Sequence, residues 1–164
     1  MTVYLKRMPL GIAGAISRLQ DTTVEPVLLK SANLFPAYGL VGKYDDGGYF
    51  VPLAEGDTAD RIQGIYVRPY PTTSMPDKAY IIGTNNNYTG DNLKRGYMTV
   101  KLDGDASSIK KGAPVYVRTG KPKETSPLGS FLNVAIDGET ALLPNAQFTG
   151  AGDADGNVEI SYKI

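Results

Sequence analysis

The residue types that most often do chemistry in proteins are missing from this chain. None of its 164 residues is a histidine or a cysteine. Without histidine there is no usual general base for a serine or cysteine nucleophile, and the commonest transition-metal ligand is lost. Without cysteine there is no disulfide framework, and zinc, haem and iron–sulfur sites lose their other main ligand. Paired-carboxylate or Ser–Lys catalysis stays open by composition, but the Gly-x-Ser-x-Gly pattern does not occur.

Two polar clusters are candidates for binding a ligand. The acidic loop from Gly152 to Asn157 departs from an EF-hand, because its second glycine comes too early and no glutamate follows at the required place. It is better interpreted as a hairpin turn, and Asp103-Gly104-Asp105 likewise. The run Asn85 to Tyr88 resembles a carbohydrate contact in composition, but it is typical of a solvated loop. The sequence therefore predicts no catalytic, metal-binding or cofactor-binding residue, and no enzyme.

The charges are balanced, with 17 Lys and Arg against 17 Asp and Glu. A sequence-independent nucleic-acid binder needs uncompensated cations to displace counterions from phosphates, and a membrane-surface protein needs a polybasic run. We therefore expect the chain to bind neither nucleic acid nor a membrane surface. Runs of about 20 apolar residues are absent and the N-terminus does not resemble a secretion signal, which favours synthesis in the cytoplasm.

The elements available to position any surface site are short strands. Tyr97 to Leu102 alternates between apolar and polar residues, as does Val158 to Ile164. Pro26 places its own strand at an edge or a bulge, because proline cannot donate to the ladder. Shorter or less regular runs predict further strands at Val24–Leu29, Tyr49–Val51, Ile65–Arg68, Val115–Arg118 and Ala141–Leu143.

Glycine- and aspartate-rich turns separate these strands at short intervals, which is typical of a sandwich or barrel. One short helix is expected at Ala106 to Lys111, ended by Gly112. The sequence predicts an all-β fold: a single small β-barrel or jelly-roll-like sandwich with little helix. The segments Gly64–Arg68 and Pro114–Arg118 resemble each other. We attribute the echo to two strands of similar burial, and a duplicated half-barrel is the alternative.

The first 23 residues differ from the rest of the chain. They mix apolar residues with Gly, Lys, Arg and Pro, without a clean strand period or helix caps. A disordered tail would contain fewer apolar residues. We therefore expect an extended N-terminal arm over residues 1–23, which finds its partner outside its own domain, and a β-domain over residues 24–164.

Four segments resemble the capsid decoration, or cement, proteins of tailed bacteriophages. They are MTVYLKRMPLGIAGAISRLQDTTVEP at residues 1–26, GDTADRIQGIYVRPYPT, LKRGYMTVKL, and GDADGNVEISYKI at residues 152–164. The order of a GYMTV strand, a Lys-Lys-Gly turn and a PVYVR strand is also similar to that family. The resemblance extends over nearly the whole chain, but it includes no catalytic signature.

The resemblance implies a β-barrel or jelly-roll body on the outer surface of the capsid in the virion, made in the host cytoplasm. It implies that the chain binds the major capsid protein, bridges neighbouring subunits of it, and forms trimers with itself. No cofactor is implied. An alternative function is a β-sandwich adhesin or carbohydrate-binding module. Asn85 to Asn87 and the tyrosine-rich loops suggest it. A carboxylate hydrolase is a more distant alternative.

Two sets of residues are candidates for these contacts. The arm supplies apolar anchors for the capsid: Leu5, Met8, Leu10 and Ile12. A homotrimer would join through tyrosines and arginines at outward strand and loop positions, because these residues bury area while keeping a directed hydrogen bond. Our candidates for that interface are Tyr66, Arg68, Tyr70, Tyr116 and Arg118.

Overall fold

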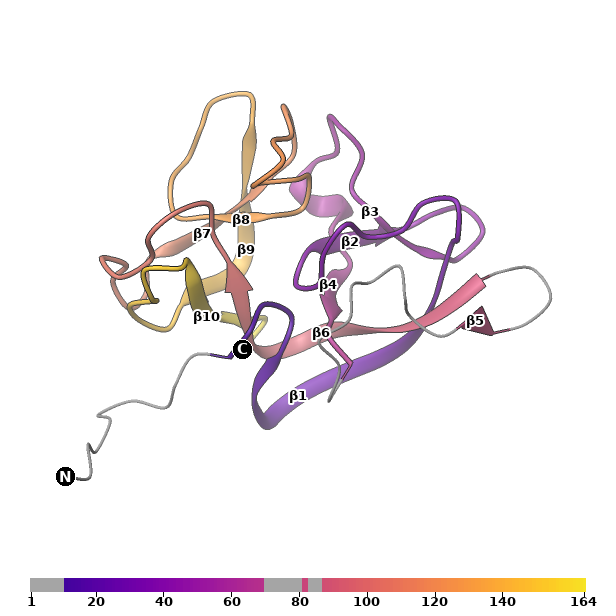
Figure 1. The fold of residues 1–164 in the computed structure, drawn as a ribbon, viewed down its shortest axis with the longest axis horizontal. Helices are drawn as coiled ribbons and strands as arrows, with labels where there is room; N and C mark the ends of the chain where they lie inside the picture. The colour runs from indigo at the N-terminus through magenta and orange to yellow at the C-terminus, as the bar shows by residue number, and fades with distance from the viewer. Residues whose placement is uncertain (1–10, 70–80, 83–86) are drawn as a thin grey trace.

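The computed structural model describes residues 11–69, 81–82 and 87–164, and it confirms the all-β fold (Figure 1). Its strands are β1 (Ile16–Leu29), β2 (Val41–Tyr44), β3 (Phe50–Pro52), β4 (Gly64–Val67), β5 (Ile81–Ile82), β6 (Asn87–Lys101), β7 (Pro114–Arg118), β8 (Phe131–Leu132), β9 (Thr140–Phe148) and β10 (Asn157–Tyr162). The 3-10 turn η1 (Ala59–Arg61) is the sole helical element in the described ranges. Within those ranges, no helix has the length and apolar character needed to cross a membrane.

The strand pairings close two rings that share the long strand β6. The first ring runs β1-β3-β2-β4-β6 and closes because β1 also pairs with β6 in an antiparallel ladder. The second runs β6-β10-β9-β7-β8 and closes through a bridge between Leu102, directly after β6, and Phe131 of β8. In Figure 1, β7 to β10 lie to the left and β2 to β4 to the right, above β1 and β6. The expected barrel or sandwich thus takes the form of two small strand rings joined on one strand.

The strands that the sequence predicted are present, and three others were not foreseen. Each predicted segment overlaps one of β1, β3, β4, β6, β7, β9 and β10. Pro26 lies in β1 opposite Asp91 of β6, at a point where β1 has no second neighbour, as a proline requires. The unforeseen strands β2, β5 and β8 have two to four residues each. Such lengths are too short to display a period of two.

The helix expected at Ala106 to Lys111 is wrong, because the segment forms successive turns. Ile109 N–H donates to Ala106 O, and Ala113 N–H donates to Lys110 O. Just before the segment, the Asp105 carboxylate accepts a hydrogen bond from the backbone N–H of Ser107 at 2.7 Å. Such a local side-chain bond offers the backbone an alternative to the helix.

The expected boundary between arm and domain at residue 23 falls inside β1, which begins at Ile16. The residues just before β1 are also tied to the body. Gly14 N–H donates to Thr99 O, and Arg68 N–H donates to Gly14 O. Gly14 adopts φ +84°, and a Cβ there would lie 2.6 Å from the Cβ of Tyr38, so the close approach needs a glycine. Gly14, Ile16, Arg18 and Thr23 therefore pair within their own chain.

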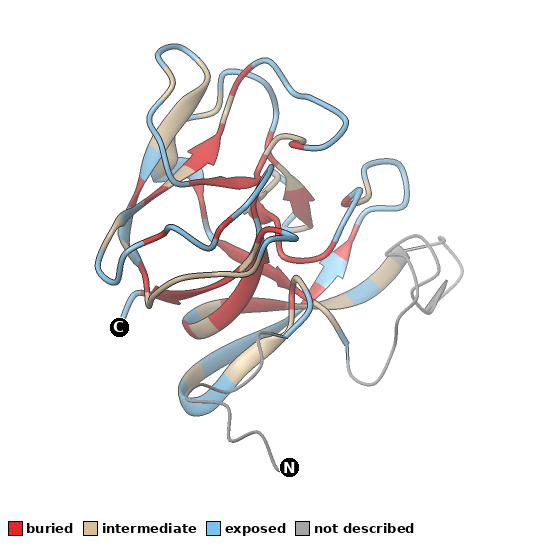
Figure 2. Cartoon of the chain, turned by 60° about the vertical axis from the view of Figure 1, so that its left-hand side comes forward, coloured by how far each residue is buried: buried red, intermediate tan, exposed pale blue. Residues whose placement is uncertain are grey.

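Two hydrophobic cores fill the protein, and β4 lies between them. The larger core contains Ile65 and Val67 of β4 together with residues of both strand rings. The smaller core is aromatic and gathers Phe35, Tyr38 and Phe50 around Tyr66. All four residues of β4 are therefore buried, although their side chains point alternately to opposite faces. Figure 2 shows the buried residues concentrated in the strands, with the exposed ones in the connecting loops and along part of β1 and β6.

Candidate interaction surface

Tyr66 does not lie on the surface, so its predicted outward position is wrong. Its side chain is 1% exposed and belongs to the aromatic core. The ring stacks on Phe35 at 4.7 Å between centroids and contacts Tyr38 at 5.1 Å. Burial raises the pKa of the Tyr66 hydroxyl far above its ordinary value. The side of β4 that the sequence assigned to solvent is covered by residues 34–40, so Tyr66 cannot contact another copy.

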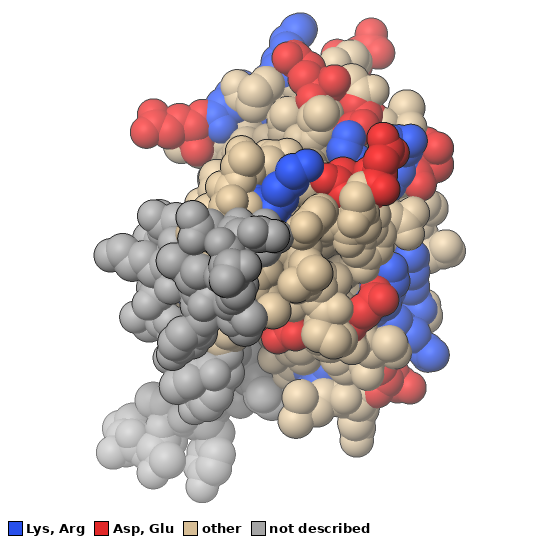
Figure 3. All heavy atoms as spheres, turned by 90° about the vertical axis from the view of Figure 1, so that its right-hand side faces the viewer, with Lys and Arg blue, Asp and Glu red and all other residues tan. Residues whose placement is uncertain are grey.

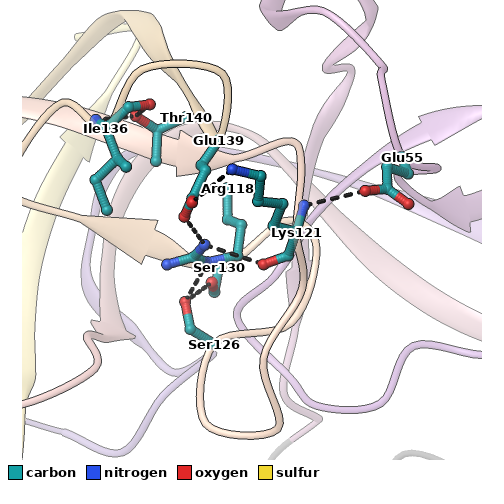
Figure 4. Close-up of polar contacts among 8 residues, drawn as sticks. All are labelled: Glu55, Arg118, Lys121, Ser126, Ser130, Ile136, Glu139 and Thr140. Atoms are coloured by element: carbon teal, nitrogen blue, oxygen red, sulfur yellow. Dashed lines mark hydrogen bonds and ion pairs between the residues drawn. The ribbon is translucent and has the colours of Figure 1, made fainter.

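Arg118 is also buried, and its predicted outward position is wrong for a similar reason. It is 1% exposed although it shares a strand face with the half-buried Tyr116. The loop after β7 covers it, as Figure 4 shows. Nε donates to Ser126 Oγ at 2.8 Å, while Nη1 donates to Glu139 at 3.0 Å and to the Lys121 carbonyl at 3.2 Å. The guanidinium therefore fastens loop 119–130 to β7 and β9.

Glu139 is the charged partner at the centre of this cluster. Its carboxylate accepts hydrogen bonds from Arg118 and from Lys121 Nζ, the latter at 3.3 Å. These two cations hold the pKa of Glu139 below its usual range, with the Arg118 hydrogen bond as the largest cause. Ser126 and Ser130 complete the cluster with a hydrogen bond of 2.7 Å (Figure 4). Arg118 and Lys121 both donate to the same carboxylate, so the arrangement of the cluster is that of a structural clamp.

Two of the five proposed contact residues, Arg68 and Tyr116, keep part of their side chains accessible. Tyr70 lies outside the described residues. Tyr116 lies opposite Leu132 of β8 and Leu142 of β9. Leu142 is 53% exposed, and nearby along the chain Val134 is 51% exposed. Tyr116 and Leu142 thus form a short, partly exposed apolar row across β7 and β9, next to the buried Leu132.

Arg68 lines a hollow of about 460 Å³ beside the end of β4. Its guanidinium lies over the Tyr38 ring, 4.5 Å from the centroid, and Nε donates to the Ala13 carbonyl at 3.0 Å. The structure gives the two terminal Nη atoms no hydrogen-bond partner among the described residues. The hollow is lined by Ala13, Pro36, Ala37, Tyr38, Gly39, Leu40, Arg68, Lys101, Lys123, Glu124, Thr125, Pro127 and Ser130.

A four-residue bulge projects from β1, and the sequence did not predict it. Arg18 pairs with Tyr97 and Thr23 pairs with Arg95, so residues 19–22 lie opposite the single residue Gly96. Leu19, at the start of the bulge, is 86% exposed. Gly96 adopts φ +142°, and a Cβ on it would lie 3.0 Å from Thr22 Oγ1. A glycine inside a strand is the sequence signal that could have revealed this bulge.

The base of this bulge is fixed to β10 by an ion pair. Arg18 donates through Nε and Nη2 to the two carboxylate oxygens of Glu159, at 3.1 and 2.6 Å. Thr149 Oγ1 also donates to this carboxylate. Burial raises the pKa of Glu159, but the hydrogen bonds from Arg18 and Thr149 outweigh this effect and leave that pKa below its usual range. Glu159 is therefore an ionised, almost buried anchor, although strand alternation placed it on an open face.

Of the proposed arm anchors, Leu5, Met8 and Leu10 lie outside the described residues. Ile12 is half exposed, at 50%. Most of the Asn85 to Asn87 candidate for glycan binding also lies outside them. The Gly152–Asn157 loop is the turn that the sequence predicted, with Asp153 accepting from the backbone N–H of Asn157 at 2.7 Å. Among the described residues, no three acidic side chains form a group able to hold a metal ion.

Charges of both signs are mixed over the face drawn in Figure 3. The accessible features are therefore apolar side chains on a charge-balanced surface. Against known proteins, a family model described as XM1 gp53 minor capsid protein matches residues 1–162. The chain belongs to this family. A search of curated proteins finds no match.

A solved structure titled "The capsid of Myoviridae Phage XM1" contains a chain with the fold of this member of the XM1 gp53 family. The TM-score is 0.70 and the identity is 18%, over 96% of this chain and 93% of that one. Membership of a minor capsid protein family makes the chain a structural, non-enzymatic protein that associates with the capsid shell of the virion. The resemblance to tailed-phage capsid proteins is thereby confirmed.

Proposed function

We propose that this XM1 gp53 family member decorates the outer surface of the shell and bridges neighbouring major capsid subunits. The observation that carries the proposal is the set of large apolar side chains left exposed on a folded, charge-balanced body: Ile12, Leu19, Val24, Leu28, Val134 and Leu142. Three of them, Leu19, Val24 and Leu28, come from the single strand β1, and a protein partner could bury them together. With the family assignment, the partner that fits this surface is the shell.

The N-terminal arm is the first part of the proposed contact. Leu5, Met8, Leu10 and Ile12 would pack on a capsid subunit, since burying one such side chain is worth roughly 1.5–3 kcal/mol. The structure changes how this contact is tested. A deletion of residues 1–23 would remove half of β1, whereas a deletion of residues 1–10 leaves every described strand intact.

The test is binding to purified shells that lack this protein. The full chain, the variant lacking residues 1–10, and Leu142→Asp are added separately, and the bound copies per shell subunit are measured by gel densitometry. We expect the deletion to lower occupancy at least tenfold while thermal unfolding stays unchanged. Equal occupancy of the deleted and full chains would contradict the role of the arm. Loss with Leu142→Asp would assign the Tyr116 row to the shell contact.

The outer location has its own test, because the chain lacks cysteine. A cysteine placed at exposed Asp155 should react with a membrane-impermeant maleimide on intact particles as fast as in the free protein. Protection on intact particles, followed by reaction after the shell is opened, would place the chain inside.

We further propose that the bound form is a cyclic homotrimer, because a closed ring presents several footprints at once and gains avidity. With Tyr66 and Arg118 buried, Arg68 and Tyr116 are the remaining described candidates for the contact. Light scattering of Tyr116→Ala and Arg68→Ala, compared with the unaltered chain, separates them. An unchanged mass for both variants would exclude both residues.

A further inference from the structure

The bulge at residues 19–22 is an ordered projection with one apolar and one acidic side chain. Thr22 Oγ1 donates to the Arg18 carbonyl at 2.7 Å, and the Arg18–Glu159 pair holds the base. Asp21 adopts φ +58° at the tip, and its carboxylate is 3.8 Å from Arg95, at the outer limit of an ion pair. Leu19 stands beside it with 86% of its surface in solvent. Among the described residues, none covers this leucine.

The hollow beside Arg68 has the opposite character. Its walls are apolar at Tyr38, Leu40 and Pro127, and it also contains three cations, Arg68, Lys101 and Lys123, against the single anion Glu124. The Arg68 guanidinium is already oriented by the Ala13 carbonyl and the Tyr38 ring. Its terminal N–H groups are therefore placed to receive a carboxylate without further ordering.

We propose that the bulge of one copy docks in the hollow of a second copy of this chain. Leu19 would lie against the apolar wall, and the Asp21 carboxylate would meet Arg68 and the two lysines. The bulge cannot fill the hollow of its own copy. It lies opposite Gly96, and Lys101 of the hollow is five residues further along β6, roughly 17 Å at the rise of an extended strand.

Such a contact joins two different surfaces, so it is heterologous and repeats from copy to copy until a ring closes. The bulge–hollow contact would be the interface of the proposed homotrimer, and it rests on that self-association. It does not depend on which surface of the shell the chain covers. The contact between copies and the decoration of the shell can therefore be disproved separately.

Cross-linking tests the contact, since the cysteine-free chain gives no background reaction. Leu19→Cys and Ala37→Cys are made separately, because Ala37 is exposed and lines the hollow. Each variant alone, and the two mixed, are treated with a short bis-maleimide, both free and bound to shells. Asp155→Cys, outside both surfaces, replaces Ala37→Cys in the control mixture.

We expect a 19–37 cross-linked dimer in the mixture and none in the control mixture. The double variant Leu19→Cys/Ala37→Cys should give a closed cross-linked ring. Absence of the 19–37 product in both the free and the bound state would overturn the proposal. A Leu19→Cys product with a shell subunit instead would assign the bulge to the shell. Shell occupancy, measured on the same samples, reports separately on the decorating role.

A charge exchange provides the second test. Asp21→Lys and Arg68→Glu should each lower the association constant at least tenfold. Mixing the two should recover pairwise association, because unlike copies are complementary at both of their contacts. Combining both changes in one chain should restore association, because the new lysine meets the new glutamate. Equal association of all variants would exclude the Asp21–Arg68 contact. Unchanged thermal unfolding of each variant is the control for folding.

Discussion

The strands β4 and β7 carry the same Tyr-Val-Arg sequence, yet the structure uses their side chains in opposite ways. On β4 the tyrosine is buried in the aromatic core, while Arg68 lines an open hollow. On β7 the arginine is buried in a polar clamp, while Tyr116 stays half exposed beside Leu142. The difference arises because each strand is covered by a different loop at a different point. Identical local sequence therefore determines which side chains share a face, and the covering loop determines which of them stay accessible.

The two tyrosines should give the largest contrast. Tyr66→Ala removes a fully buried ring from a packed aromatic cluster, which costs about 3–5 kcal/mol in the free energy of unfolding. Tyr116→Ala removes a half-exposed ring and should cost about 1 kcal/mol. Equilibrium unfolding in urea measures both values. Equal losses would show that the two strands are buried alike and would remove the contrast.

The two arginines should show the reverse order, with a somewhat smaller difference. Arg118→Ala removes one donor from each of Glu139, Ser126 and the Lys121 carbonyl, so we expect a loss of about 3 kcal/mol in the free energy of unfolding. Arg68→Ala should cost about 1 kcal/mol or less, because the described residues give its side chain one hydrogen bond and it lines a hollow. Faster proteolytic cleavage within residues 119–130 should accompany the first change. Stability equal to that of Arg68→Ala would contradict the clamp.

The smallest effect on stability is expected for the ion pair of the buried Glu159 with Arg18, compared with that of the exposed Glu25 with Lys94. The pKa of Glu159 is lowered in the folded protein, so its ionised form contributes stability above the unfolded pKa of about 4.3, and this stability is lost as pH falls through the folded pKa. Glu159→Gln should therefore destabilise the protein at pH 7 and flatten its loss of stability in acid. Glu25→Gln is the matched control, because its pair with Lys94 spans 3.7 Å and half of the Glu25 side chain is exposed. Unfolding profiles that stay parallel from pH 7 to pH 3 for all three proteins would contradict this account.

These contrasts also explain what the sequence could predict. Alternation along Tyr97 to Leu102 located the C-terminal part of β6, and the absence of histidine and cysteine correctly indicated a structural rather than catalytic protein. Strand periodicity also grouped Tyr66 with Arg68 and Tyr116 with Arg118. It could not show that residues 34–40 cover Tyr66 or that loop 119–130 covers Arg118, because both covers depend on tertiary packing.

The bulge at Leu19 escaped prediction for a related reason. Residues 16–23 lack a clean period because four of them face one glycine, so an irregular pattern was interpreted as an arm outside the domain. The partner that makes this segment a strand lies far along the chain, in β6. The helix expected at Ala106 to Lys111 failed through local competition, since the Asp105 carboxylate binds the backbone where the helix would begin.

The sharing of β6 between both strand rings has a consequence for how the chain folds. During synthesis from the N-terminus, β1 to β4 emerge before the strand that closes their ring, and the second ring waits for β10. Contacts between such distant segments slow folding, because loop-closure entropy must be overcome before the contacts form. We therefore expect the first half of the chain to have unpaired strand edges until β6 emerges, and both rings to complete their pairing on that one strand.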